Sequence, residues 1–410
     1  MKNIAGLRLK LKVQTEINNS AIRNSNSALP PGWHWVRLGE VCNINPRRPK
    51  NFIRSPDTPT TFVPMAAVDE KTGTIARPEV VPYSKVSKGY TYFEENDVLF
   101  AKITPCMQNG KHVIARNLID GLGFGTTEFH VIRPNNEILS EWIHFFIRQP
   151  YFLQQATAYF TGAVGQQRVP EDFLSNYIIP LPPVEEQQHI AAKIQELMQD
   201  VERARTACEK QLEAAKVLPA AYLREVFESE EAKRWERKNF KECIMRRKGL
   251  KIKGILQKNY QKTGVYPIVD QGHNLTCGYT DDQAKLYRGE LPVIVFGDHT
   301  RIFKYIDFPF AIGADGTQII QPNREIIMPK FFYFALLNLK IRSLGYSRHY
   351  KLLKEMSIPI PPLPIQHRIA AELKQKMAQV ESLQSAIRNQ QSALNSLPQA
   401  ILRKAFKGEL

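Results

Sequence analysis

One stretch of this chain occurs twice, and the two copies are separated by a constant 179 residues. The segment Ile179–Val184 (IPLPPV) returns as Ile358–Leu363 (IPIPPL), and Ile190-Ala-Ala returns as Ile369-Ala-Ala. Further matches at the same offset continue to the Leu-Arg-x-x-Phe motif that ends at Phe227 in the first copy. Because the register holds over about fifty positions without a gap, we interpret the two copies as an internal duplication.

Each copy begins with a Pro-rich segment, which favours extended backbone, and continues as a long helical pattern. Apolar residues recur at steps of three and four with charged residues between them, which is typical of a coiled-coil seam. The positions expected to pair the helices or to dock a partner are Ile190, Ile194, Leu197, Val201, Leu373, Val380, Leu383, Ile387 and Leu394.

The two seams differ in bulk, which suggests that the helices pair with each other. The first copy has small residues at Ala204, Cys208 and Ala215, where the second has leucine or isoleucine. Two unrelated surface helices are the alternative interpretation. Leu218-Pro219 and Leu397-Pro398 are expected to mark equivalent breaks near the far ends of the helices.

Between the helical segments the pattern changes to short β-type runs broken by Pro and Gly, which predicts α+β globules. The first globule should include an amphipathic helix around Ser140 to Arg148 that continues through Tyr159. The two globules share only their position and a weak similarity at the start, Trp35…Cys42 against Trp235…Cys243. The predicted parts are a basic arm at 1–29, a globule at 30–177, a helix at 178–232, a globule at 233–357 and a helix at 358–410.

The charge of the chain points to a polyanionic partner. The net charge is +16, and residues 233–262 hold twelve basic residues against two acidic ones. Such a cluster is often only a solvated face, but the tyrosines and glycines within it favour contact with phosphates. The five cysteines form no CxxC pair, and no run of eighteen apolar residues occurs, so we expect a cytoplasmic protein without a disulfide framework, zinc cluster or membrane span.

A search for catalytic motifs finds little. There is no Walker A pattern and no HExxH pair. Gly121–Gly125 resembles a cofactor loop only superficially, because a strand pattern follows it where a nucleotide loop should open a helix. The acidic residues Asp57 and Asp69 with Lys71 imitate a nuclease grouping, but such short strings are common by chance. We therefore expect a recognition protein without catalytic residues, metal or cofactor of its own.

Several strings resemble the specificity subunit of type I restriction–modification systems. They are the Pro-rich segments Ile179–Gln187 and Ile358–Gln366, the opening Trp33…Gly39-Glu40-Val41, and the strings Asp97–Pro105, Asn109–Lys111, Gly125–His130, Phe296–Arg301 and Gly313–Thr317. The resemblance covers about residues 30–410. Pro364-Ile365 departs from the pattern, because the first copy has Glu185-Glu186 there.

The resemblance implies a non-catalytic subunit in which each globule is a target-recognition domain for one half of a split, asymmetric site in double-stranded DNA. The helices would dock two methyltransferase subunits, which bring S-adenosylmethionine. Restriction motor subunits, which use ATP and magnesium, would join the larger complex. An antiparallel pair of helices of about 30 residues would span about 45 Å, a little more than one turn of B-DNA.

Base readout favours Arg, Lys, Asn and Gln in loops, with polar neighbours. The candidates in the first globule are Lys102, Gln108, Asn109, Lys111, Thr126, Gln166, Gln167 and Arg168. Those in the second are Lys253, His299, Arg301, Lys304, Arg348 and His349, and the expected phosphate contacts are Arg246, Arg247, Lys248 and Lys251. Two alternatives stay open, a nuclease or methyltransferase with its own active site and a coiled-coil adaptor with incidental basic charge.

Overall fold

The computed structural model describes residues 29–163, 165–245, 253–314, 316–345 and 347–410. The chain forms two compact units, each with both helices and sheets. The first unit holds the chain up to Thr206 together with Gln391–Leu410, and the second holds Ala207–Gln390. The predicted basic arm lies outside the described residues, except for its last residue.

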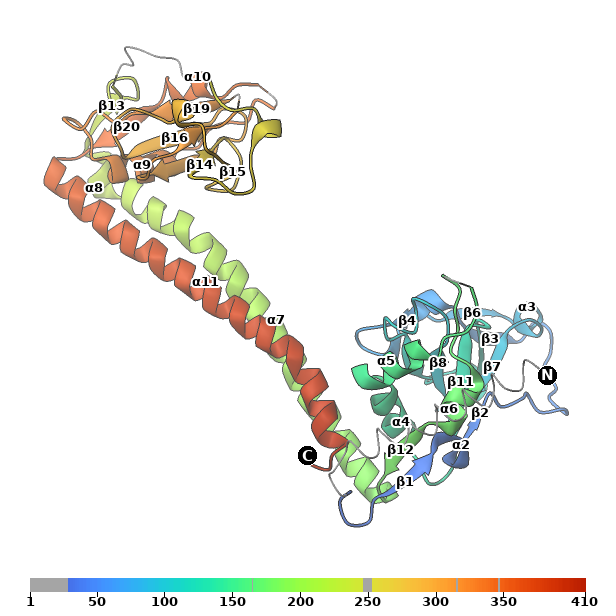
Figure 1. Ribbon diagram of the computed structural model, residues 1–410. Helices are drawn as coiled ribbons and strands as arrows, with labels where there is room; N and C mark the ends of the chain where they lie inside the picture. Colours follow the sequence, from blue (N-terminus) through green and yellow to red (C-terminus); the bar gives the residue numbers. More distant parts are fainter. Residues whose placement is uncertain (1–28, 164, 246–252, 315, 346) are drawn as a thin grey trace. The chain divides into compact units, whose positions relative to one another are not determined.

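Two long helices, α7 (Val184–Phe227) and α11 (Leu363–Ala405), contribute to both units (Figure 1). They begin 179 residues apart, so the departure at Pro364-Ile365 does not shift the second start. Their 44 and 43 residues correspond to about 65 Å each, so the expected length of 30 residues was wrong. Within the described residues no helix is long and apolar enough to cross a membrane.

The expected breaks at the two Leu-Pro pairs are also wrong, because both helices continue through Pro219 and Pro398. An internal proline removes one backbone hydrogen bond and crowds the preceding turn. The turns that follow it here are held by burial: Leu223 and Phe227 enter the core of the second unit, and Leu402 enters the core of the first. Packing therefore offsets the local cost of the proline.

The two helices run antiparallel in the pair. In the second unit Lys376 Nζ lies 3.1 Å from Glu225 Oε2, and Gln384 Nε2 donates to Ala215 O at 3.1 Å. A residue further along α11 therefore contacts a residue earlier in α7. Seven of the nine expected seam positions are buried: Ile190, Ile194, Val201, Leu373, Val380, Ile387 and Leu394. Leu197 is half-buried, and Leu383 is exposed because the neighbouring Gln384 takes the seam position.

The first unit contains two four-stranded sheets. One has the order β6 (Glu79–Pro82), β3 (Pro59–Val63), β10 (Leu122–Gly125) and β7 (Thr91–Glu94), and the other has β2 (Cys42–Ile44), β11 (Phe129–Pro134), β8 (Val98–Ala101) and β9 (His112–Ile114). Two-stranded sheets pair β1 (His34–Arg37) with β12 (Ile178–Leu181) and β4 (Val68–Asp69) with β5 (Thr74–Ile75). The α-helices are α2 (Leu38–Val41), α3 (Tyr83–Val86), α4 (Ser140–Ile147), α5 (Pro150–Ala158) and α6 (Glu171–Asn176).

The helix expected around Ser140 to Arg148 is α4, whereas its expected continuation to Tyr159 is a separate helix, α5. Gln149 between them has extended backbone, with φ −69° and ψ 135°. The reason is Pro150, which disfavours helical geometry at the preceding residue and itself starts the next helix.

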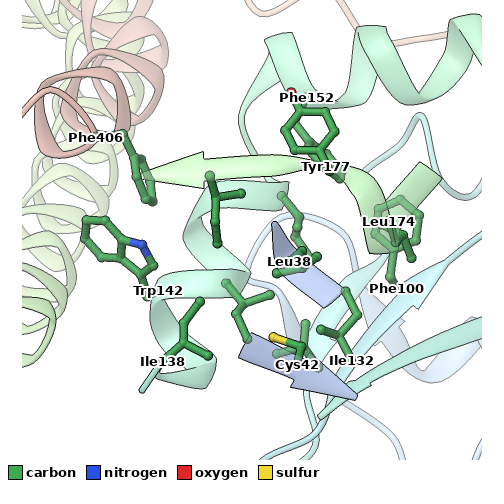
Figure 2. Packing of buried hydrophobic residues seen from close by; sticks show 14 of the residues in the cluster. Leu38, Cys42, Phe100, Ile132, Ile138, Trp142, Phe152, Leu174, Tyr177 and Phe406 are labelled. Carbon is green, nitrogen blue, oxygen red and sulfur yellow. The ribbon is translucent and has the colours of Figure 1, made fainter. Parts of the chain in front are cut away.

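The core of the first unit contains Trp142, which is fully buried (Figure 2). Its ring centroid lies 5.5 Å from that of Trp33 and 4.5 Å from that of Phe406. Phe406 follows the end of α11, so the last residues of the chain complete the core of the first unit. The same arrangement occurs in the second unit, where Phe331 lies 6.4 Å from Trp235 and 5.5 Å from Phe227.

The second unit has two three-stranded sheets. The first has the order β15 (Gly278–Thr280), β14 (Tyr266–Val269) and β18 (Ala311–Ile312). The second has the order β17 (Phe303–Ile306), β16 (Val293–Gly297) and β19 (Thr317–Ile320). A two-stranded sheet pairs β13 (Glu236–Asn239) with β20 (Ser357–Ile360). The α-helices of this globule are α8 (Glu230–Lys233), α9 (Pro329–Leu337) and α10 (Tyr350–Leu353).

The two globules share the arrangement of their central strands, although the sequence suggested that they share only position and a weak start. In the first unit β8 lies between β11 and β9, and β3 pairs in parallel with β10. In the second unit β16 lies between β19 and β17, and β14 pairs in parallel with β18. The central strands β8 and β16 are buried at every position. Many different apolar sequences can fill such a core, so the strand order is the same although the residues differ.

The weak sequence similarity at the start of the globules was also aligned wrongly. Trp33 precedes β1 and Trp235 precedes β13, and these strands pair with β12 and β20 in the same register. Trp33 is therefore the equivalent of Trp235, and Val41 is the equivalent of Cys243. Trp35, which the sequence suggested, lies on the strand with its side chain exposed.

Candidate nucleic-acid interface

In the first unit three segments meet where β8 ends. The backbone N–H of Lys102 donates to Glu128 O at 2.9 Å, and the carbonyl oxygen of Lys102 accepts from Val169 N–H at 2.9 Å. These bonds hold together the loop after β8, the loop before β11 and the segment before α6. We call the surface formed by residues 102–104, 126–128 and 166–169 the strand-end face of the first unit.

The second unit has an equivalent strand-end face, formed by residues 298–301, 316–317 and 347–349. The backbone N–H of Asp298, directly after β16, donates to Gly316 O at 2.8 Å, and the carbonyl oxygen of Asp298 accepts from His349 N–H at 2.9 Å. The hydrogen bonds are those of the first unit, and they place Arg348 where the first unit has Arg168. The shared topology therefore brings loop residues of matching position to the same edge of each globule.

On the first strand-end face the side chains are predominantly polar. Arg168 binds Glu128 through two hydrogen bonds of 2.8 Å, and its Nη1 donates to Gln166 O at 2.9 Å. The bond from Arg168 lowers the pKa of the Glu128 carboxyl. Gln166 is exposed, while Gln167 and Thr126 are half-buried. The structure thus brings together five of the residues predicted for this globule, with Lys102 among them.

Lys102 is half-buried beside a pocket of about 390 Å³ in the first unit. Burial lowers the pKa of its ammonium, although the nearby Glu128 acts in the opposite direction. Within the described chain the ammonium has no hydrogen bond or salt bridge. A cation that is partly desolvated and not paired is suited to bind an anion.

The other candidates of the first unit lie elsewhere. Gln108 and Asn109 are exposed and line a second pocket with Arg148. Lys111 is directed inward, where its Nζ donates to Val68 O at 2.9 Å and lies 3.9 Å from Glu70. The carbonyl oxygens of Met65 and Val68 hold the ammonium within the unit, so its role as a base contact stays a prediction.

In the second unit Arg301 and Arg348 are exposed on the strand-end face, and His299 between Asp298 and Thr300 is half-buried. Arg301 has a positive φ of 62° and its Nη1 donates to Ile341 O at 3.1 Å. Lys253 is exposed and does not belong to the strand-end face. Its carbonyl oxygen accepts a hydrogen bond from Lys285 Nζ at 3.4 Å.

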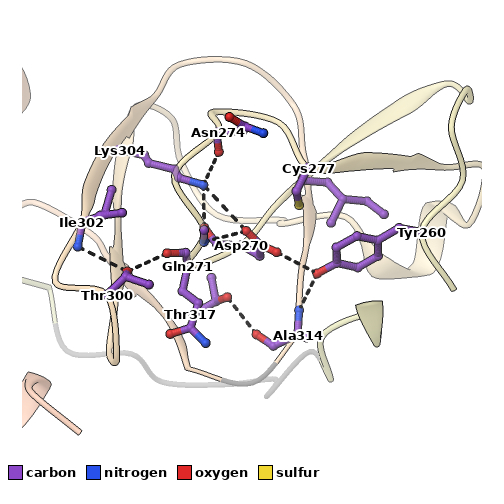
Figure 3. Close-up of polar contacts among 12 residues, drawn as sticks. Tyr260, Asp270, Gln271, Asn274, Cys277, Thr300, Ile302, Lys304, Ala314 and Thr317 are labelled. Carbon is purple, nitrogen blue, oxygen red and sulfur yellow. Dashed lines mark hydrogen bonds and ion pairs between the residues drawn. The ribbon is translucent and has the colours of Figure 1, made fainter. Parts of the chain in front are cut away.

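Lys304 cannot reach DNA, because its side chain is buried inside the second unit (Figure 3). Its Nζ donates to the carbonyl oxygens of Asp270 and Asn274 and lies 3.8 Å from the Asp270 carboxylate. Burial lowers the pKa of this ammonium, and the Asp270 carboxylate opposes that shift. The lysine thus fixes the loop after β14, and its prediction as a DNA contact was wrong.

His349 is also buried, with both ring nitrogens in use. Its Nε2 accepts from Leu344 N–H at 2.9 Å, so Nδ1 carries the proton and donates to Asp298 O at 2.8 Å. The ring therefore holds the second strand-end face together, and its prediction as a DNA contact was wrong. The remaining predicted phosphate contacts, Arg246, Arg247, Lys248 and Lys251, lie outside the described residues.

Comparison with known proteins decides the family. The model of the type I restriction modification DNA specificity domain matches residues 30–214 and 232–390. The chain belongs to this family. Each matched stretch contains one complete strand-end face, so the family domain occurs twice, once for each globule.

Two relatives from Escherichia coli, the specificity subunits of the type I restriction enzymes EcoEI and EcoAI, are 37% and 35% identical over 190 residues. The match covers 46% of this chain and spans 32% of the length of each relative. The crystal structure of the HsdS subunit from Thermoanaerobacter tengcongensis is 27% identical, with a TM-score of 0.69 over 94% of this chain and 99% of that one. A chain from a study of complex assembly and conformational transition of the type I R-M system, also 27% identical, has a TM-score of 0.70 over 93% and 100%.

Some residues of the candidate interface were not predicted from the sequence. Arg47, Arg48 and Tyr90 line the same pocket as Lys102. The basic string Pro46-Arg-Arg-Pro-Lys50 after a short β-type run was a usable signal for the two arginines. Tyr90 carries no such signal, because only the pairing of β7 with β10 brings it to the pocket. Within the described chain no three His, Cys, Asp or Glu side chains are grouped to hold a metal ion.

Proposed function

We propose that this chain is a non-catalytic subunit that recognises a split, asymmetric sequence in double-stranded DNA, with one half-site for each globule. The observation that supports this most is the recurrence of the strand-end face. Equivalent backbone hydrogen bonds hold it in both units, while the accessible side chains differ: Lys102, Gln166 and Gln167 in one, His299, Arg301 and Arg348 in the other. A conserved frame with unlike side chains is what reading two different half-sites requires, because base edges are distinguished by hydrogen-bonding side chains.

The proposal gives the two long helices the tasks of spacing and docking. Two methyltransferase subunits would bind to them and bring S-adenosylmethionine, and restriction motor subunits would bring ATP and magnesium. The net charge of +16 supports a complex that works on DNA, because neutralised phosphates release counterions and strengthen binding. The proposed place of action is the cytoplasm, and no membrane partner is proposed.

The proposal is tested by mapping modified bases in host DNA with and without this protein. We expect a split motif, two short half-sites separated by a spacer of fixed length, to be modified only when the protein is present. A map that does not change when the protein is removed would refute the proposed role in recognition.

Two alternatives are separated by a purified system. Incubation of the chain alone with DNA, magnesium and S-adenosylmethionine is expected to give neither cleavage nor methyl transfer. Either activity, in the absence of partner subunits, would show an enzyme with its own active site. Absence of any sequence preference even with a methyltransferase partner would show instead a coiled-coil adaptor.

A further inference from the structure

The pocket beside Lys102 lies where the two four-stranded sheets of the first unit meet. Phe124 comes from one sheet and Phe129 from the other, and Lys102 follows β8 of the second sheet. Its volume of about 390 Å³ is near the lower end of the usual range for small-molecule sites. The space accommodates one compact group of nucleotide size.

The walls of the pocket are aromatic. Tyr92 and Phe124 are buried, with ring centroids 5.5 Å apart. Tyr90 is 44% exposed, and its ring meets Phe62 edge-on at 5.0 Å between centroids. The exposed part of the Tyr90 ring can therefore stack on a planar group that enters from solvent, while the T-shaped contact with Phe62 supports the ring.

The charged residues that line the pocket are all basic. Arg48 is held in place, because its Nη1 donates to Tyr83 Oη at 2.6 Å and to Ser87 O at 3.2 Å. Arg47 is exposed, and Lys102 is half-buried without a hydrogen bond or salt bridge among the described residues. Among the described residues, no acidic side chain lines this pocket.

The acidic residues that lie nearby are already engaged. Glu94 forms an ion pair with Arg133 at 2.9 Å, and Glu128 binds Arg168 at 2.8 Å. Glu171 accepts from the Asn45 side-chain amide at 2.8 Å. The basic groups of the pocket are therefore left to act on a ligand, and the ligand that suits them is planar, aromatic and anionic.

We propose that this pocket receives one unstacked nucleotide of the bound DNA, with its base on Tyr90 and its phosphate beside Arg47 and Lys102. The inference rests on the proposed function, and it adds a site where a base leaves the stack. DNA is favoured over a peptide because Lys102 belongs to both the pocket and the strand-end face. Stacking on an aromatic ring accepts any base, so the pocket strengthens binding without setting the sequence.

The test compares three oligonucleotides of one sequence with the full chain: a paired duplex, the same duplex with a single-nucleotide bulge, and one single strand. Extraction of a base from a paired duplex costs the free energy of its pairing and stacking, whereas a bulged nucleotide has no pairing to break. We expect the bulged duplex to bind about tenfold more tightly than the paired duplex. Tyr90→Ala should reduce this ratio to about one, whereas Tyr90→Phe should keep it.

Tyr151→Ala is the matched control, because Tyr151 is an exposed tyrosine of the same unit that does not line the pocket. It should keep the bulge preference. Lys102→Gln should weaken binding of the bulged duplex and flatten its salt dependence. Retention of the bulge preference in Tyr90→Ala, or its absence in the native chain, would overturn the inference.

Further arms separate the possible failures. Equal binding of paired and bulged duplexes, with sequence preference intact, would overturn the pocket proposal alone. Absence of binding to every duplex would overturn the proposed function as well. If free thymidine monophosphate or deoxyadenosine monophosphate bound in a Tyr90-dependent way while bulged and paired duplexes bound alike, the pocket would serve a free nucleotide and the proposal would be wrong.

Discussion

Two equivalent glutamines, Gln187 of α7 and Gln366 of α11, allow the energetics of the two units to be tested separately. Gln187 is fully buried, and its side chain makes three hydrogen bonds. Its Oε1 accepts from Leu139 N–H at 2.9 Å, and its Nε2 donates to Glu137 O at 2.8 Å and to Pro182 O at 2.9 Å. The residue thus joins the start of α7 to the segment before α4.

The substitution Gln187→Met keeps the length of the side chain and removes all three bonds. A typical net contribution of about 1 kcal/mol for each bond gives a loss of about 3 kcal/mol in the free energy of unfolding of the first unit. The assay is urea unfolding followed by tryptophan fluorescence in a Trp235→Phe background. In that background the remaining tryptophans, Trp33, Trp35 and Trp142, all belong to the first unit.

Two variants serve as controls. Gln188→Met changes the exposed neighbour and should leave the transition within about 0.5 kcal/mol of the parent. Gln366→Met removes the same three bonds in the second unit, with Met328 N–H, Ile326 O and Pro361 O, and should leave the first unit's transition unchanged. A change below about 0.5 kcal/mol for Gln187→Met would refute the reasoning. Equal shifts for Gln187→Met and Gln366→Met would show that the two units unfold together.

Burial lowers the pKa of His144 from 6.5 to about 4, so the unfolded chain takes up a proton before the folded chain does. The free energy of unfolding of the first unit should therefore fall by about 3 kcal/mol as the pH falls from 6.5 to 4. His144→Gln should reduce this loss in urea titrations, and an unchanged pH profile would contradict the assignment. Replacing Arg246, Arg247, Lys248 and Lys251 with alanine should flatten the dependence of DNA affinity on salt without changing sequence preference, as measured by anisotropy titrations at several salt concentrations; an altered preferred sequence would refute their role as phosphate contacts. Insertion of seven residues into both α7 and α11 should change the spacer between half-sites but not the half-sites, as read by mapping modified bases; altered bases within a half-site would refute the spacing role of the helices.

Much of the fold could be predicted because periodic sequence patterns indicate it. The constant offset of 179 residues identified the duplication, and the heptad steps at Ile194, Val201, Leu373 and Val380 identified buried seam positions. The heptad pattern depends on residues a few positions apart along one helix, so local spacing is sufficient to reveal it. Helix ends were less visible, because the turns beyond Pro219 are held by packing with distant parts of the chain.

The candidate interface shows the limit of reasoning from residue types. Arg301 and Arg348 are exposed on the strand-end face as expected, but Lys111, Lys304 and His349 satisfy buried backbone groups instead. A lysine or histidine in a polar loop has the same local signature in both situations. Its role depends on whether a carbonyl oxygen from another part of the chain lies within reach.

The sequence by itself determined the duplication, the presence of two long helical segments and the basic character of the protein, because each depends on spacing or total charge. The tertiary structure decided that the two globules have one topology and that their strand-end faces correspond. It also decided which polar side chains are left at the surface. The physical reason is that strand pairing joins segments far apart in the chain, such as Lys102 with Glu128 and Asp298 with Gly316, and no local pattern encodes those partners.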